Sequence, residues 1–560
     1  MQILDRNRTD FDAIVVGSGA TGGWAAKQLT EAGLRVAVLE AGQKITEADF
    51  SEHVEPWQTK YRYRSKEFMA DRPIQRRNYA CRETNYQWFV SDVDSPYTTP
   101  DGKPFWWIRM RVLGGRSLSW GRGAFRLSDL DFKAGSRDGF GPDWPVSYAE
   151  MQPHYETVEK YIGVSGMAEG LPQLPDSVFQ PPLPMYCGEQ RLKAAVWDKF
   201  RRVVTHGRTA VLTQPLNGRA ECHYCGPCEQ GCVTHSYYSS PFTVLKAAEA
   251  TGRLTLITDA VVSHVTTDAE TGLATGVAYI ERESRAAREI KAKIVVLCAS
   301  TLESTRILLN SAPAGLANSS GVLGHYLMDH LMVGVSGTVP LVEGERVWAG
   351  APRSPGHIVI PRFRNVTETT TNSFIRGYHI TGSCSPQFNM RAMGFGADLK
   401  RRVREEDGYT RMGLGAFIEC LPRYENYVEL DKSKVDAWGI PVLRIQMSWG
   451  ENELAMRKDA FQQLSEMLEA AGCRDLPTRA PAASTPGFAI HEVGTAPMGA
   501  DPKTSVLNKY AQAWDVKNLF VTDGACYPTN ASQNPTLNMM ANTVRVCEYI
   551  VEQSKQGALG

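Results

Sequence analysis

The sequence lacks the features that would direct it to a membrane or to a nucleic acid. Its 560 residues contain no apolar run of the roughly 18 or more residues that predicts a membrane-spanning helix. The 61 Lys and Arg side chains are balanced by 61 Asp and Glu side chains, so no net charge favours nucleic acid or an anionic membrane surface. We therefore expect no transmembrane segment, no nucleic-acid partner and a small neutral substrate.

A secretory leader is also missing from the first residues. Residues 1–23 show no basic start followed by an apolar core and a cleavage site, because their only apolar run is a short predicted strand at 11–16. We expect that any export of the chain depends on another factor.

Cysteine is scarce outside one short loop. Of the 12 cysteines, four fall within 222–232. We expect most of the others to be small buried side chains, and a disulfide scaffold is improbable in a chain of this length. These eight are Cys81, Cys187, Cys298, Cys384, Cys420, Cys473, Cys526 and Cys547.

The N-terminus carries a nucleotide-binding pattern. A strand at 11–16 leads into the turn GSGATG at 17–22, a helix follows, and a second apolar run at 34–39 ends at Glu40. In this pattern Gly17 forms the tight turn, Gly19 lets the backbone approach a pyrophosphate, Gly22 packs helix on strand, and the acid binds the adenosine ribose. Ser18 and Ala41 complete the predicted site. The alternative is a tight glycine turn without a ligand.

A second glycine-rich turn, RVLGGRSLSWG at 111–121, favours FAD over NAD. An NAD enzyme of ordinary size has no need of it, whereas its small residues would let the backbone approach an extended cofactor near a flavin ring. The alternative is a surface loop that only turns. The predicted contacts are Gly114, Gly115, Ser117, Ser119 and Trp120.

The C-terminal segments are the most specific part of the sequence. They read HEVGTAPMG at 491–499, NLFVTDG at 518–524 and YPTNASQNPTL at 527–537, and an earlier run reads IVVLCAS at 294–300. Together with both glycine turns, they make the chain resemble the glucose–methanol–choline (GMC) oxidoreductases from about residue 11 to 549. Within that family the Asn-Pro-Thr-Leu ending and the second turn resemble the pyranose oxidase branch.

The resemblance implies the reacting residues. The family's catalytic pair corresponds to His491, a base for a substrate hydroxyl, and Asn534, which can bind the same oxygen but cannot act as a base. That branch often tethers FAD through a histidine, and the corresponding residue here is Ser119, so we predict non-covalent FAD. Further FAD contacts implied by the resemblance are Val262, Ala299, Asp523, Gly524, Pro535 and Thr536.

The cysteine loop has the spacing C-x2-C-x2-C-x3-C, formed by Cys222, Cys225, Cys228 and Cys232. This spacing is typical of ferredoxin iron–sulfur clusters, in which the fourth cysteine can serve a second cluster. Since no second run exists, and since related sugar dehydrogenases carry three-iron clusters, we favour 3Fe-4S and keep 4Fe-4S open. A zinc site and purely structural cysteines are the alternatives.

These observations predict an α/β (α+β overall) fold with a Rossmann-like FAD-binding domain and an interleaved substrate domain built on an antiparallel β-sheet. We expect 1–130, 205–325 and 480–560 to form the FAD-binding domain, which includes the cysteine loop at 219–236. Residues 131–204 and 326–479 would form the substrate-binding domain. Apolar runs such as PVLRIQMSW at 441–449 are expected to be strands of that sheet.

The resemblance also implies the reaction. It indicates an FAD and iron–sulfur sugar dehydrogenase, similar to glucoside 3-dehydrogenases, that oxidises a ring hydroxyl of a sugar or glucoside to a ketone. The alternatives are a sugar oxidase that uses oxygen, a gluconate- or sorbitol-type dehydrogenase, and a flavin and iron–sulfur electron carrier without an alcohol substrate. Implied partners are a small accessory subunit and a cytochrome or other acceptor, with co-export to a bacterial periplasm expected and a cytoplasmic location as the alternative.

Overall fold

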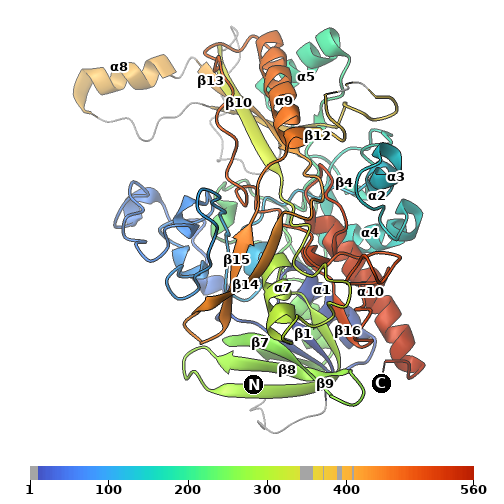
Figure 1. The fold of residues 1–560 in the computed structure, drawn as a ribbon. Coiled ribbons are helices and arrows are strands. Elements are labelled where there is room, and N and C mark those ends of the chain that lie inside the picture. The colour runs from blue at the N-terminus through green and yellow to red at the C-terminus, as the bar shows by residue number, and fades with distance from the viewer. Residues whose placement is uncertain are drawn as a thin grey trace.

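A seven-stranded sheet forms one end of the molecule (Figure 1). The computed structural model describes residues 11–340, 357–369, 371, 373–386, 394–406 and 409–559. The parallel part of the sheet contains β6 (Leu254–Ile257), β2 (Val36–Leu39), β1 (Phe11–Val16), β9 (Ala287–Leu297) and β16 (Leu519–Val521). Its antiparallel part, β7 (Ala260–Thr267) and β8 (Ala274–Glu281), joins through the first half of β9.

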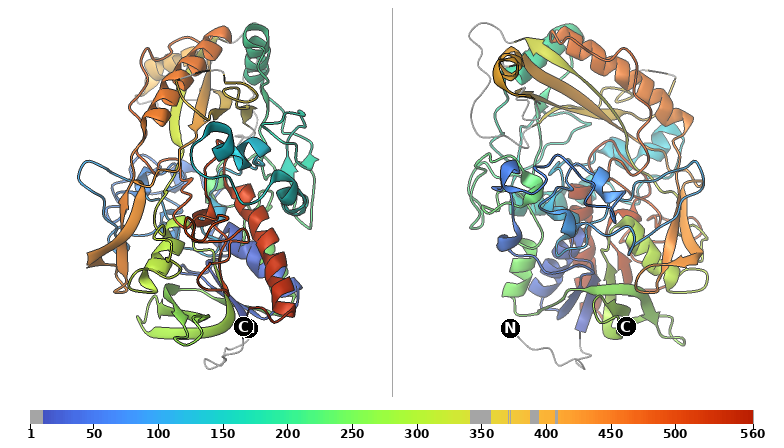
Figure 2. Two further views of the ribbon diagram at one scale, coloured as in Figure 1. Left: turned by 45° about the vertical axis from the view of Figure 1, so that its right-hand side comes forward. Right: turned by 90° about the vertical axis from the view of Figure 1, so that its left-hand side faces the viewer.

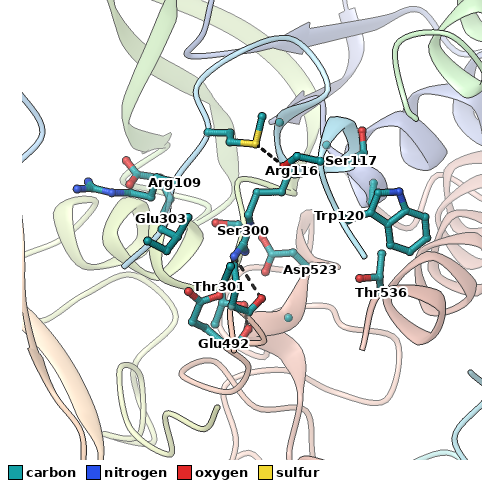
Figure 3. Close-up of a pocket in the computed structure, with 18 of the residues that line it drawn as sticks. Arg109, Arg116, Ser117, Trp120, Ser300, Thr301, Glu303, Glu492, Asp523 and Thr536 are labelled. Atoms are coloured by element: carbon teal, nitrogen blue, oxygen red, sulfur yellow. Dashed lines mark hydrogen bonds and ion pairs between the residues drawn. The ribbon is translucent and has the colours of Figure 1, made fainter. Parts of the chain in front are cut away.

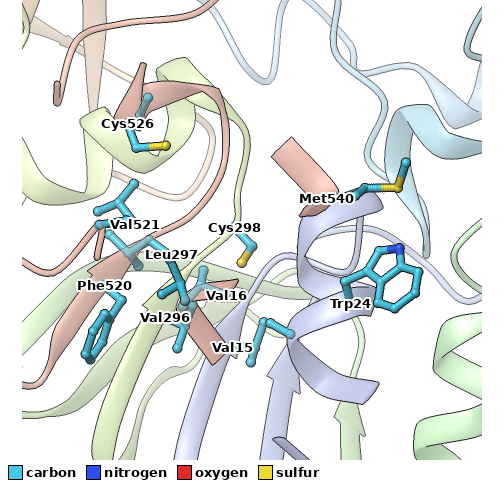
Figure 4. Close-up of a cluster of buried hydrophobic side chains, with 14 of the residues drawn as sticks. Val15, Val16, Trp24, Val296, Leu297, Cys298, Phe520, Val521, Cys526 and Met540 are labelled. Atoms are coloured by element: carbon cyan, nitrogen blue, oxygen red, sulfur yellow. The ribbon is translucent and has the colours of Figure 1, made fainter. Parts of the chain in front are cut away.

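The central parallel strand β1 is buried along most of its length because helices and loops cover it. Ala13 to Val16 on β1 are each at most 3% exposed, as expected of a parallel strand buried on both faces. Figure 4 shows Val15 and Val16 beside Val296 and Leu297 of β9, with Trp24 of α1 nearby. The elements around this sheet are α1 (Ala20–Glu31), α4 (Tyr148–Ile162), α6 (Val244–Ala250), α7 (Thr301–Asn310) and α10 (Thr536–Lys555).

A second, antiparallel sheet lies at the other end of the molecule (Figures 1 and 2). Its order is β10 (Leu331–Pro340), β13 (Tyr409–Ile418), β12 (Tyr378–Pro386), β11 (Ile358–Ile360) and β5 (Thr205–His206). The helices α9 (Glu451–Ala470) and α5 (Cys187–Phe200) pack against it. The parallel FAD-type sheet and this separate antiparallel sheet confirm the predicted fold class.

Two strands join different sheets from those expected. The run at 441–449 forms β15 (Pro441–Gln446), which pairs with β14 (Tyr427–Val435), bridges to Thr98 through Arg444, and packs near α7 of the first sheet. The expectation that it belongs to the main antiparallel sheet is therefore wrong. The short strand β5 begins the range 205–325, yet it pairs with β11 of the second sheet. Alternation of apolar and polar residues predicts that a strand forms, but it does not identify the strand with which it pairs.

The smaller elements complete the described chain. A capping box formed by Ser147 and Glu150 begins α4, where the Ser147 hydroxyl accepts from the Glu150 N–H at 3.3 Å. Of the eight scattered cysteines, only Cys187 is exposed, and the rest are buried.

No helix in the described ranges is long and apolar enough to cross a bilayer. The remaining α-helices and strands of the described residues are α2 (Asp129–Phe132), α3 (Ala134–Asp138), α8 (Gly396–Glu406), β3 (Val164–Ser165) and β4 (Phe179–Gln180).

Candidate active site

A cavity of about 670 Å³ opens where the first sheet faces the second. Met332 of β10 and Phe417 of β13 line it from the second sheet, opposite the end of β1. Most of the residues predicted from the sequence line this one cavity, although they come from segments far apart in the chain. They are Gly17, Ser18, Gly19, Glu40, Ala41, Gly115, Ser117, Ser119, Trp120, Val262, Ala299, His491, Asp523, Gly524, Asn534, Pro535 and Thr536.

Two of the predicted FAD contacts, Gly22 and Gly114, are not in the cavity lining. A Cβ at Gly22 would lie 1.9 Å from the carbonyl oxygen of Gly17, so this position serves the close contact of helix and turn. Gly17 has a φ of +96°, and a Cβ there would lie 2.4 Å from the carbonyl oxygen of Cys298. Positions 17 and 22 therefore both require glycine for the shape of the turn.

Ser18 joins the two glycine turns. Its hydroxyl accepts a hydrogen bond of 2.8 Å from the Gly114 N–H and donates to the carboxylate of Glu40. The Glu40 carboxylate also accepts from the Gly42 N–H at 2.8 Å, and burial raises the pKa of Glu40. These bonds hold the second turn against the first, as a binding site for one extended cofactor requires.

The side chains of His491 and Asn534 meet inside the cavity. His491 Nε2 lies 3.1 Å from Asn534 Nδ2. Burial, and then the neighbouring His330 and Arg116, lower the pKa of His491 well below its usual value. The imidazole is therefore neutral near neutral pH, which is the state that a general base needs.

Asp329 and His330 support His491, and the sequence analysis did not identify either of them as site residues. The buried Asp329 carboxylate accepts from the backbone N–H of His491 at 3.0 Å and of Gly487 at 2.8 Å. Burial, with a smaller effect of Glu492, raises the pKa of Asp329 to about 7. His330 Nδ1 lies 2.8 Å from His491 Nδ1. In the sequence these two residues are only an ordinary Asp-His pair directly before β10, which does not indicate a role in the site.

Charged side chains that the sequence analysis did not single out also line the cavity (Figure 3). Arg116 of the second turn pairs with Glu492 at 2.9 Å, which ties that turn to the residue after His491. Glu303 at the start of α7 lies 3.5 Å from Arg111. Burial opposes it, but Arg306, Arg111 and Arg109 together lower the pKa of this buried carboxyl. These pairs hold the cavity walls together.

A buried arginine separates the cavity from the cysteine loop. Arg122 lines the cavity, is 3% exposed, and has no hydrogen-bond partner at Nε or Nη1. Although its burial opposes the effect, Cys228 and Glu229 on the loop help to raise its pKa. The loop thus lies directly behind this wall.

The four loop cysteines lie near one another. Cys228 is buried with Val211 and Tyr237, and Cys222 and Cys232 pack against the same cluster. Burial, and then Cys228 and Cys232, raise the pKa of Cys225 to about 12. The thiols fit an iron–sulfur cluster in kind and number. However, the described residues contain no group of three or more His, Cys, Asp or Glu side chains already arranged to hold a metal ion.

Comparison with known proteins identifies the family. Two sequence models described as GMC oxidoreductase match residues 198–332 and 422–543, and one described as an FAD binding domain matches residues 12–52. A 2-methyl-1,2-propanediol dehydrogenase from Mycolicibacterium austroafricanum is 30% identical over 96% of this chain and 95% of its own length. The chain belongs to the GMC oxidoreductase family. It is accordingly an FAD-dependent oxidoreductase that acts on CH–OH donors, and the FAD prediction is confirmed.

Other relatives of this GMC oxidoreductase have different names. The fructose dehydrogenase large subunit of Gluconobacter japonicus is 28% identical over 98% of both chains. A C-glycoside 3-oxidase of Arthrobacter globiformis is 26% identical over 51% of both chains. The crystal structure of pyridoxine 4-oxidase from Mesorbium loti superimposes with a TM-score of 0.59 at 16% identity, covering 96% of this chain and 99% of that chain. That last similarity shows the fold alone.

Proposed function

We propose that this GMC oxidoreductase oxidises a secondary ring hydroxyl, preferably at C3, of a sugar or glucoside to a ketone. The observation that carries the proposal is the contact of His491 Nε2 with Asn534 Nδ2 at 3.1 Å inside the cavity. Relatives named for fructose and for C-glycoside C3 chemistry support a sugar substrate.

The two polar side chains would divide the work on the substrate hydroxyl. His491 Nε2 takes the hydroxyl proton, and Asn534 Nδ2 donates a hydrogen bond that holds the same oxygen. FAD bound in the cavity supplies the acceptor for the hydride from the carbinol carbon.

The cavity residues predicted from the sequence would hold the FAD. Gly19 at the first turn of α1 offers its backbone to the pyrophosphate, and Glu40 offers its carboxylate to the adenosine ribose. Ser119 and Trp120 would contact the flavin end, since they lie in the same cavity as His491. The Ser119 hydroxyl donates to the Met110 sulfur at 2.9 Å. A serine hydroxyl has no ring nitrogen to form the covalent tether, so the FAD would be non-covalent.

We further propose that Cys222, Cys225, Cys228 and Cys232 hold an iron–sulfur cluster, with 3Fe-4S favoured over 4Fe-4S. The packing of Cys222, Cys228 and Cys232 in one cluster, whose Tyr237 lies against Arg122, supports it. Such a cluster would supply one-electron transfer towards an external acceptor. Iron and acid-labile sulfide should be found in anaerobically purified protein and lost in Cys228→Ser, whereas the exposed Cys187→Ser should retain both. Absence of both elements from the wild type would refute the cluster.

Partners and location are part of the same proposal. One relative is named a large subunit, which supports a small accessory subunit for this chain, together with a cytochrome or other electron acceptor. We propose co-export with that subunit to a bacterial periplasm. Co-purification of a tagged chain with a small protein encoded beside it, and its recovery in the periplasmic fraction, would support this arrangement. Full recovery of the active chain alone in the cytoplasm would contradict it.

The substrate is tested by anaerobic bleaching of the flavin. Glucosides and free sugars should reduce the bound flavin, and ketone formation at C3 should be detected by NMR of the product. His491→Gln should slow the reduction by about 10²- to 10⁴-fold, the usual contribution of a general base. The matched control is His325→Gln. Because His325 lies outside the cavity lining, this variant should retain the wild-type rate. An unbleached flavin with every sugar would refute the sugar proposal.

A second substrate class has its own support. The 30% identical relative is named for 2-methyl-1,2-propanediol, a small branched diol. Reduction of the flavin by this diol but by no sugar would favour that class. Oxygen uptake without added acceptor would favour an oxidase. Wild-type electron-transfer activity in His491→Gln would favour an electron carrier without an alcohol substrate.

A further inference from the structure

His330 has a defined protonation pattern because of its contact with a backbone carbonyl. The side chain is fully buried, and its Nε2 lies 2.5 Å from the carbonyl oxygen of Ala531. A carbonyl oxygen can only accept, so Nε2 must carry a hydrogen. Burial lowers the pKa of His330 to about 4, so near neutral pH the ring is neutral and carries only that one hydrogen.

The hydrogen on Nε2 determines what His330 can do at its other nitrogen. Nδ1 of a neutral imidazole with a hydrogen on Nε2 has a free lone pair and accepts a hydrogen bond. His491 Nδ1 is 2.8 Å away and must therefore donate. The neutral His491 ring then has its hydrogen on Nδ1 and its lone pair on Nε2.

That lone pair faces the cavity. His491 Nε2 lies 3.1 Å from Asn534 Nδ2, an amide nitrogen that can only donate. The donors and acceptors thus agree along the whole chain, from Asn534 through His491 and His330 to the carbonyl of Ala531. No contact in this chain of hydrogen bonds favours the opposite tautomer of His491.

We propose that His330 is a positioning residue that keeps His491 in the Nδ1–H tautomer, so that Nε2 is always available to accept the substrate proton. The inference rests on the proposed role of His491 as the base. A histidine ring without such a partner populates both tautomers, and the tautomer with Nε2–H cannot accept the proton. The preceding residue, Asp329, holds the backbone of His491, so two adjacent residues of the chain fix both its main chain and its ring.

The proton balance follows from the same contacts. As the C–H hydrogen leaves the alcohol as hydride, the hydroxyl proton moves to His491 Nε2 and the substrate becomes a ketone. The resulting imidazolium keeps its Nδ1–H bond to His330. Onward transfer to His330 is disfavoured because burial lowers the pKa of that ring to about 4, although its Nε2–H bond to the Ala531 carbonyl partly opposes this effect. The proton therefore leaves His491 from the cavity side.

Two variants separate the hydrogen-bond role from mere packing. His330→Leu removes the acceptor, whereas His330→Asn places an amide oxygen near the position of Nδ1. We expect anaerobic flavin reduction by substrate to slow by about tenfold to a hundredfold in His330→Leu, within the range of general-base effects. His330→Asn should recover most of this rate. Substrate affinity and the absorption spectrum of the bound flavin should stay unchanged in both variants.

The ratio of the wild-type rate to the variant rate should also be the same at every pH at which His491 is neutral, because the fraction of a tautomer does not depend on pH. If His330→Leu does not fold, His330→Gln replaces it, since its longer amide keeps a donor near Ala531 but places no acceptor at the Nδ1 position. Two outcomes would overturn the inference while leaving His491 as the base. One is a wild-type rate in His330→Leu or in its Gln replacement. The other is an equal loss of rate in the Asn and Leu variants. A wild-type rate in His491→Gln would instead overturn the proposed function itself.

Discussion

The hydroxyl of Ser18 accepts a hydrogen bond of 2.8 Å from the backbone N–H of Gly114, which lies 96 residues later in the chain. This bond joins the first glycine turn, between β1 and α1, to the second. The same hydroxyl donates to Glu40, so three parts of the nucleotide-binding site share one polar contact. The shape of this site therefore depends on both turns together.

Alanine at Gly19 and at Gly22 should have different effects. A Cβ at Gly19 would meet only the carbonyl oxygen of Gly114 at an ordinary 3.9 Å, whereas at Gly22 it would lie 1.9 Å from that of Gly17. We expect Gly19→Ala to fold with a nearly unchanged Tm for the flavin-free protein but to bind FAD more weakly, because its Cβ meets the pyrophosphate. Gly22→Ala should lower the Tm of the flavin-free protein itself.

Thermal unfolding and titration with FAD measure the two effects separately. Equal FAD affinity in Gly19→Ala and wild type would show that the pyrophosphate does not approach Gly19.

Replacement of Asn534 tests the second polar group of the site. Asn534→Ala removes the donor that faces His491 Nε2 and is expected to slow flavin reduction by about tenfold to a hundredfold, as loss of a hydrogen bond of roughly 1–3 kcal/mol would do. Because a base remains, the loss should be smaller than in His491→Gln. Single-turnover reduction under anaerobic conditions measures both rates, and a larger loss in Asn534→Ala would reverse the two assigned roles.

The pH dependence of flavin reduction should lack an inflection from His491 near pH 6.5. Its lowered pKa keeps this base neutral through that range, so the rate should fall only in more acidic solution, where the ring becomes protonated. Asp329 has a pKa of about 7 and contacts the same residue, so Asp329→Asn is the matched control. An inflection near pH 6.5 that persists in Asp329→Asn would contradict the neutral buried base.

His379 should destabilise the fold in acid. The ring is 4% exposed and stacks on Phe417, and burial lowers its pKa to about 3 although a backbone contact with Ser532 opposes this effect. Below about pH 6.5 the unfolded chain binds a proton here that the folded protein does not, so stability is lost as the pH falls from 6.5 towards 3. His379→Phe removes this loss.

The advantage of His379→Phe over the wild type should therefore be larger at pH 5 than at pH 7, by about 2 kcal/mol. Thermal unfolding of the flavin-free proteins at the two pH values measures it as a wider gap in Tm. A gap of equal size at both values would mean that His379 is protonated in the folded protein.

The flavin should be released by denaturation. Because Ser119 stands where a tethering histidine would form the covalent bond, acid precipitation should leave all of the FAD in the supernatant. Flavin fluorescence of the supernatant and of the washed pellet measures the distribution. Flavin that stays with the protein would reveal a covalent bond to some other residue.

The sequence by itself determined the local parts of this protein. The strand, turn, helix and second strand from 11 to 40 could be predicted because their pattern depends on contacts between near neighbours, such as Gly17 with Gly22. The strands of the antiparallel sheet were predicted from alternation, which likewise involves only neighbouring positions. His491 and Asn534 were named through family motifs.

Only the tertiary structure decided which distant segments meet. The sequence gives no sign that β15 pairs with β14 rather than joining the larger sheet, because an alternating strand fits many partners. Likewise, His330 and His491 lie 161 residues apart, and no local pattern links them. Their contact follows from the packing of β10 beside the C-terminal segment, and it is this packing that assigns the lone pair of His491 to the cavity.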